Sequence, residues 1–188
     1  KTLALRNSAI SIFQAGVLAA DPYKAVHQCL KTDQNQSQIW LTGLGESRTG
    51  NWSLIHLIAI GKAACAMIKA AIDIIPSQLV GNAVAVTNYE NEMPLDGVKV
   101  LAASHPLPDE AGFNAAKQCH EVAEKAKAGE LVLVLVSGGG SALTIRPPVH
   151  GNSSVGTRPI CCMVRKAGPS STPNSDMASL VTCTAVGE

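Results

Sequence analysis

The sequence predicts an α/β domain in which a mostly parallel sheet is covered by helices on both faces. Several short segments are apolar on consecutive residues, which is typical of strands that are buried on both faces. These segments alternate with stretches of helical character, as they do in parallel α/β folds. Hydrophobic residues make up 46% of the 188 residues but aromatic residues only 3%. Such a composition suits a core of closely packed aliphatic side chains.

Two helices are expected before the first strand of the parallel sheet. Between Leu3 and Ala19, apolar residues recur at helical spacing and form one stripe, which consists of Leu3, Ile10, Phe13 and Val17. A second helix is expected to begin at Pro22, with Asp21 as its N-cap, and to continue to about Leu30.

The stretch from Lys31 to Ser53 is polar and rich in Gln, Asn, Ser and Gly. It is therefore predicted to be a loop or an insertion, although it is longer than most connections within a compact domain. We expect it to interrupt an amino-terminal domain that covers residues 1–143.

A repeating order of strands and helices follows. The aliphatic segments predict four strands, at residues 54–60, 80–87, 98–104 and 131–136. Helices are expected at residues 62–75 and 109–128, between the first and second strands and between the third and fourth. These elements predict a three-layer, Rossmann-like arrangement.

The regular pattern ends after Leu143. Residues 144–188 contain five prolines and no aromatic residue, and they show no extended helical or strand period. We therefore expect an irregular carboxyl-terminal tail. Because the pattern is lost abruptly, the tail resembles the product of a reading-frame change or of alternative splicing.

Charge and cysteine content exclude several classes of partner. The formal net charge is +1 and charged residues make up 15%, so a nucleic-acid partner is not expected. The longest aliphatic run, Leu131–Val136, is far shorter than the roughly 20 residues of a membrane span. The six cysteines form no C-x-x-C pair and no zinc spacing with histidine, so no metal site is predicted and a reducing cytoplasm is favoured.

Candidate site residues follow the predicted strands, because the carboxyl ends of parallel strands lie along one edge, where ligands bind. Ser137, Gly138, Gly139, Gly140 and Ser141 form the most distinctive turn. Its glycines allow N–H groups to converge on a phosphate or carboxylate, and its hydroxyls add donors. The alternative is a tight turn without a ligand.

Lys62 and His105 are the other candidates. Lys62 follows Gly61 at the expected start of a helix, where an ammonium favours an anion, but many such lysines are merely solvated. His105 follows another strand and could polarise a hydroxyl, or could simply bond the backbone of its turn. Asp109 and Glu110 most simply cap and charge the next helix.

Three motifs, in this order, resemble the amino-terminal part of the class II glycerate kinases. They are Gly61–Ala64 with the preceding strand, Ser104–Gly112, and Leu131–Leu143. These enzymes are the glycerate 2-kinases of the MOFRL type, some of which are labelled hydroxypyruvate reductases. The resemblance runs from about Leu5 to Leu143 and accounts poorly for residues 31–53.

The resemblance implies phosphorylation of D-glycerate to 2-phosphoglycerate by ATP with Mg²⁺, in a two-domain protein more than twice as long as this chain. It implies that Lys62 is a catalytic residue and that the Ser137–Ser141 turn lies at the active-site cleft. The family's second domain is not recognisable in residues 144–188.

Two alternatives remain open. One is a non-catalytic α/β module that binds an anion or pairs with a full-length subunit. The other, weaker, is a nicotinamide-dependent hydroxypyruvate reductase, although the dinucleotide fingerprint G-x-G-x-x-G is missing. The sequence leaves the oligomeric state open, with a homodimer among the arrangements considered.

Overall fold

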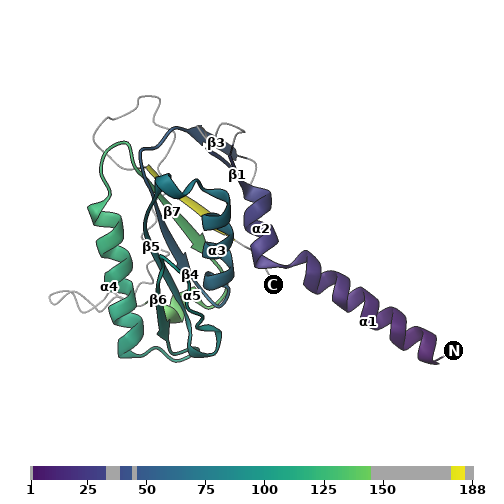
Figure 1. Ribbon diagram of the computed structural model, residues 1–188. Helices are drawn as coiled ribbons and strands as arrows, with labels where there is room; N and C mark the ends of the chain where they lie inside the picture. Colours follow the sequence, from purple (N-terminus) through teal and green to yellow (C-terminus); the bar gives the residue numbers. More distant parts are fainter. Residues whose placement is uncertain (1, 33–38, 44–45, 145–178, 185–188) are drawn as a thin grey trace.

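The computed structural model describes residues 2–32, 39–43, 46–144 and 179–184. Its centre is a five-stranded sheet with the strand order β6-β5-β4-β7-β8, in which all neighbouring strands are parallel. Helices lie on both faces of this sheet (Figure 1). The predicted α/β fold with a mostly parallel sheet is therefore confirmed.

The strands and helices of this unit lie close to their predicted positions. Its strands are β4 (Ile55–Ile60), β5 (Val80–Asn88), β6 (Lys99–Ala103) and β7 (Leu131–Val136). Its helices are α3 (Ala64–Ile74), α4 (Glu110–Lys125) and the short α5 (Gly140–Leu143), with 3-10 turns η1 (Ser77–Leu79) and η2 (Tyr89–Asn91). The helix predicted to start at Lys62 begins two residues later.

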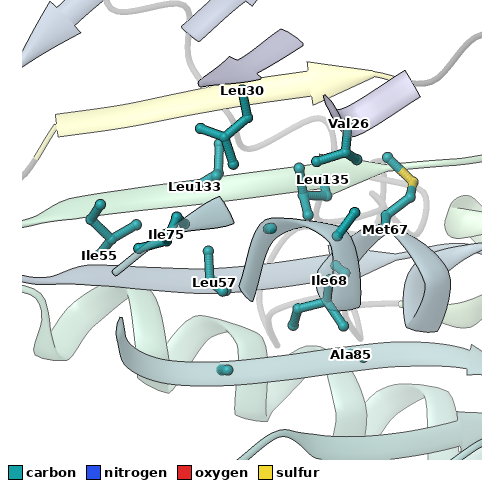
Figure 2. Packing of buried hydrophobic residues seen from close by; sticks show 14 of the residues in the cluster. Val26, Leu30, Ile55, Leu57, Met67, Ile68, Ile75, Ala85, Leu133 and Leu135 are labelled. Atoms are coloured by element: carbon teal, nitrogen blue, oxygen red, sulfur yellow. The ribbon is translucent and has the colours of Figure 1, made fainter. Parts of the chain in front are cut away.

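Alternate residues of the central strands face two separate cores. Leu57 of β4 and Leu133 of β7 pack with α2 and α3 in one core, part of which is shown in Figure 2. Ile58 and Val134, their next neighbours in the sequence, pack with α4 and α5 in the other. Because every residue of β4 is buried, this strand is apolar at every position except His56.

Both leading helices are present. Helix α1 (Thr2–Ala19) is 18 residues long, and α2 (Pro22–Cys29) begins at the predicted cap, where the Asp21 carboxylate accepts the N–H groups of Tyr23 and Lys24. Val26 of α2 is buried in the core. No residue of α1 is buried, and the helix extends away from the body of the domain (Figure 1).

Within the described residues, no single helix is both long and apolar enough to cross a membrane. Helices α1 and α2 together pass this test by length and composition, but they are bent by 48°.

The prediction of a loop over Lys31–Ser53 is wrong for most of that stretch. Antiparallel strands occupy β1 (Leu30–Thr32), β2 (Ile39–Gly43) and β3 (Glu46–Gly50), and residues 33–38 and 44–45 lie outside the described part. The side chains of Leu30 and Ile39 are buried in the core beside α2 and α3. Leu30 and Ile39 thus connect the small sheet to the core of the domain.

The expectation of a wholly irregular tail also needs correction. Strand β8 (Ser179–Thr184) pairs in parallel with β7, from Leu131 opposite Ser179 to Val136 opposite Thr184. The edge of β7 offers a free row of backbone groups, and pairing with it can order a short segment that has no long period of its own. Residues 145–178 and 185–188 lie outside the described part.

Candidate functional site

The candidate site lies where the strand order of the sheet reverses. The chain passes outward from β4 to β5 and β6, and α4 then returns it to the other side of β4, where β7 lies. In parallel α/β sheets the crevice outside the carboxyl ends of the strands at such a reversal is the usual ligand site. Here the turns after β4 and β7, which contain Lys62 and Ser137–Gly139, meet at that point.

The backbone of Lys62 is held between the two neighbouring strands. Its N–H donates to the carbonyl oxygen of Gly138 at 2.9 Å. Its own carbonyl accepts from the buried hydroxyl of Thr87, at the end of β5, at 3.4 Å. The side chain is exposed. The Lys62 ammonium therefore extends into solvent from a fixed origin, next to the positive amino end of α3.

The glycine turn after β7 has two positions that disfavour a side chain. Gly139 has a φ of +89°, which other residues rarely adopt. Gly140 is buried, and a Cβ there would lie 3.2 Å from Ile60 Cγ2. Gly138 and Ser141 are exposed, and nothing lies within 4 Å of the position of a Gly138 Cβ. The solvent-facing surface of the turn is therefore open backbone.

His105, which follows β6, meets this turn. A Cβ on Gly139 would lie 3.2 Å from His105 Nε2 and 3.3 Å from Lys62 Cγ. Both side chains therefore lie next to Gly139, close to the same point. The structure therefore brings together three of the predicted site features, namely Lys62, His105 and the glycine turn. His105 is half-buried, and its peptide bond to Pro106 is cis.

Ser137 lies in the same turn, but its hydroxyl is directed at the neighbouring turn. Its Oγ accepts the N–H of Ala63 at 3.0 Å and lies 3.5 Å from the carbonyl oxygen of Ile60, to which it donates. Of the two predicted serines, only Ser141 is exposed.

Glu90, just after β5, is a site residue that sequence reasoning missed. The buried Asn88 donates through Nδ2 to the carboxylate of the exposed Glu90 and accepts from Asn91 Nδ2 at 2.7 Å. Hydrogen bonds from the Glu90 backbone and from Asn88 lower the pKa of Glu90, as do its electrostatic interactions with His105 and Lys62. An ionised carboxylate therefore lies near Lys62 and His105. In the sequence, only the position of Glu90 just after a predicted strand pointed to this site.

The turn after β5 also joins the start of α4. The Tyr89 hydroxyl donates to Asp109 Oδ2 at 2.6 Å, and Asp109 Oδ1 accepts the N–H of Gly112 at 2.9 Å. The predicted capping role of Asp109 is therefore confirmed. The bond to Tyr89 is the main cause that lowers the pKa of Asp109, and the same bond raises the pKa of Tyr89.

The groups at this edge suit an anion better than a metal ion. An ammonium, an imidazole and exposed backbone of the glycine turn are donors that phosphate and carboxylate oxygens accept. In the part of the chain that the structure describes, no three His, Cys, Asp or Glu side chains gather as a metal site.

The family described as "Domain of unknown function (DUF4147)" matches residues 8–153 of the chain. A glycerate 2-kinase of Pyrococcus horikoshii is 36% identical over 139 residues, which are 74% of this chain and 30% of that protein.

Two solved structures are also similar to this chain in sequence and in fold. A Pyrococcus horikoshii crystal structure is 34% identical, with a TM-score of 0.66 over 79% of this chain and 32% of that one. A glycerate kinase of Thermotoga maritima is 30% identical, with a TM-score of 0.61 over 80% and 32%.

The chain thus spans about 30% of the length of the curated relatives it matches. Their names support a kinase of glycerate as the function of the family. The family match covers most of the chain and includes the three turns described above. The chain belongs to the DUF4147 family and corresponds to the amino-terminal part of the class II glycerate kinases.

Proposed function

We propose that this chain forms the amino-terminal side of the active site of a D-glycerate 2-kinase, which transfers a phosphoryl group from ATP to D-glycerate. The observation that carries the proposal is the convergence of Lys62, His105 and the glycine turn at the switch point of the sheet. Phosphoryl transfer depends mainly on positive groups and N–H donors placed around the moving charge.

Each group has a role in this proposal. The Lys62 ammonium stabilises negative charge on the transferred phosphoryl group or on the bound carboxylate. The backbone of Gly138–Gly140 and the hydroxyl of Ser141 bind the same anion from the other turn. His105 donates to it or orients the glycerate hydroxyl. The resemblance implies Mg²⁺ as well, but the role assigned to these residues does not involve a metal ion.

The chain alone is expected to bind an anion but to turn over little or no substrate. Nucleotide and glycerate must be held in line, and a misplacement of about 1 Å can lower the rate roughly a hundredfold. The longer relatives have a further two thirds of chain with which to position them. A non-catalytic anion-binding module is therefore the second candidate for this chain.

A coupled assay for ADP with D-glycerate, ATP and Mg²⁺ tests turnover. Isothermal titration with inorganic phosphate and with D-glycerate tests binding. Lys62→Ala is expected to weaken binding by about tenfold or more, since a hydrogen bond to a charged group contributes roughly 1.5–3 kcal/mol. The control is Lys125→Ala, at the far end of α4, which should bind like the wild type.

The outcomes separate the two candidates. Turnover that is lost in Lys62→Ala would establish the kinase and show that this chain suffices. Binding without turnover would support the anion-binding module. Equal binding by the wild type and Lys62→Ala would remove Lys62 from the site.

A further inference from the structure

The turns after β4 and β7 are joined by a set of hydrogen bonds around Ser137. The Ser137 N–H donates to the carbonyl of Ile60 at 2.9 Å, and the Lys62 N–H donates to that of Gly138 at 2.9 Å. Between these two backbone bonds, the Ser137 hydroxyl accepts the N–H of Ala63 at 3.0 Å. The side chain thus completes a ladder that continues past the end of the paired strands.

The contact is close enough to require glycine on the opposite turn. Gly61 has a φ of +122°, and a Cβ there would lie 2.2 Å from Ser137 Oγ and 2.5 Å from the Ser137 carbonyl oxygen. Real Cβ atoms do not approach other atoms so closely, so a side chain at position 61 would force the two turns apart. The glycine at position 61 therefore allows the close approach of the two turns, and the serine at 137 holds it by hydrogen bonds.

These bonds leave the Ser137 hydroxyl little to offer an anion. A serine hydroxyl has one proton to donate and two lone pairs that accept. The proton is directed at the Ile60 carbonyl at 3.5 Å, and one lone pair receives the Ala63 N–H. Only the second lone pair of the hydroxyl remains free, and a lone pair repels the negatively charged oxygen of a phosphate or carboxylate. Ser137 is thus unsuited to bind the ligand that its turn is proposed to hold.

We propose that Ser137 is a positioning residue, which locks the Lys62 turn to the glycine turn so that both present their donors to one anion as a single unit. The inference rests on the proposed function, because it concerns the same anion. Lys62 lies one residue before the N–H that Ser137 accepts, and Gly138 follows Ser137 directly. Loss of the hydroxyl would therefore release one turn from the other exactly where the two groups of donors meet.

Amide resonances in ¹H–¹⁵N spectra test the lock, first without ligand. Ser137→Ala is expected to shift the Ala63 amide strongly, because that N–H loses its acceptor. Ser141→Ala, the matched serine at the other end of the turn, should leave Ala63 unchanged. Ser137→Thr keeps a hydroxyl and should retain the wild-type Ala63 shift. An unchanged Ala63 amide in Ser137→Ala would overturn the inference.

Titration with inorganic phosphate tests the coupling. In the wild type, the amides of Lys62 and Ala63 should respond with the same dissociation constant as those of Gly138–Ser141. In Ser137→Ala the affinity should fall about fivefold, and the amides of Lys62 and Ala63 should no longer follow those of the glycine turn. Ser141→Ala should bind more weakly while both turns still respond together.

Two failures are distinguishable. A Ser137→Ala variant in which both turns still respond together would show that Ser137 acts as a direct ligand or not at all, and would overturn the lock alone. A wild type whose amides do not respond to phosphate would overturn the proposed anion site itself.

Discussion

His56 and Glu130 form a buried pair at the amino end of the sheet, opposite the candidate site. His56 Nε2 lies 3.0 Å from Glu130 Oε2, and the backbone N–H of Asn82 donates to His56 Nδ1 at 3.0 Å. Because Nδ1 accepts this hydrogen bond, it carries no hydrogen, so the ring hydrogen is on Nε2, which donates to the carboxylate. These bonds join β4, β5 and the start of β7, so this histidine has a structural role.

The same pair gives a prediction for acid stability. The Lys127 N–H and His56 lower the pKa of Glu130 below its ordinary value of 4.5. A carboxyl whose pKa is lower in the folded state stabilises that state above its unfolded pKa. This contribution is lost as the pH falls through the folded value. The free energy of unfolding should therefore fall more steeply below about pH 4.5 in the wild type than in Glu130→Gln.

Urea unfolding followed by circular dichroism between pH 6 and pH 3 measures this difference. Glu92→Gln, an exposed glutamate in the loop after β5, serves as the control and should keep the wild-type slope. Parallel curves for the wild type and Glu130→Gln would show that the pair contributes nothing to pH dependence.

At the scale of single residues, the site could be predicted where its residues directly follow strands. Lys62, His105 and the glycine turn could be placed together from the sequence because a parallel sheet brings the carboxyl ends of its strands to one edge. Glu90 could not be assigned, because its place depends on the η2 turn and on the side-chain amide of Asn88. The inward direction of the Ser137 hydroxyl likewise depends on how closely two turns distant in sequence approach each other.

Among secondary-structure elements, α4 is capped by a residue that also binds a neighbouring turn. Asp109→Ala should lower the free energy of unfolding by about 1 kcal/mol, the usual loss when an N-cap is removed. Asp109→Asn, which can still accept the Gly112 N–H, should restore most of that stability. Thermal and urea denaturation of the two variants measure the difference. Equal losses in both would show that the charge, rather than the cap, stabilises this helix end.

The elements also differ in how well they could be predicted. Strand β7 has the predicted bounds because it is buried on both faces, so nearly every position needs an apolar residue. Strands β1 to β3 were missed because the stretch around them is rich in Gln, Asn, Ser and Gly, a composition typical of loops. Strand β8 was missed because a short segment at a sheet edge is held by its partner's backbone.

On the scale of the whole molecule, removing β8 tests whether the carboxyl-terminal segment belongs to the folded unit. A chain ending at Thr144 would leave the outer edge of β7 unpaired. The β7 amides that face β8 should then exchange with deuterium markedly faster, while those of β5 (Val84–Asn88), which pair with β6, should keep their protection. Residue-level hydrogen exchange measures both. Unchanged protection across Leu131–Val136 would show that β8 contributes nothing to the sheet.

Helix α1 is a long rod that is connected to the rest of the domain at one end only. Its 18 residues correspond to a rod of about 27 Å, and the break at Asp21-Pro22 is where it joins the body. Its large apolar side chains, such as Phe13 at 72% exposure, meet solvent instead of the core. A rotation of only about 10° at that joint would carry the far end of such a rod roughly 5 Å. A small change at the joint with α2 would therefore displace the far end of α1 by several ångströms relative to the sheet.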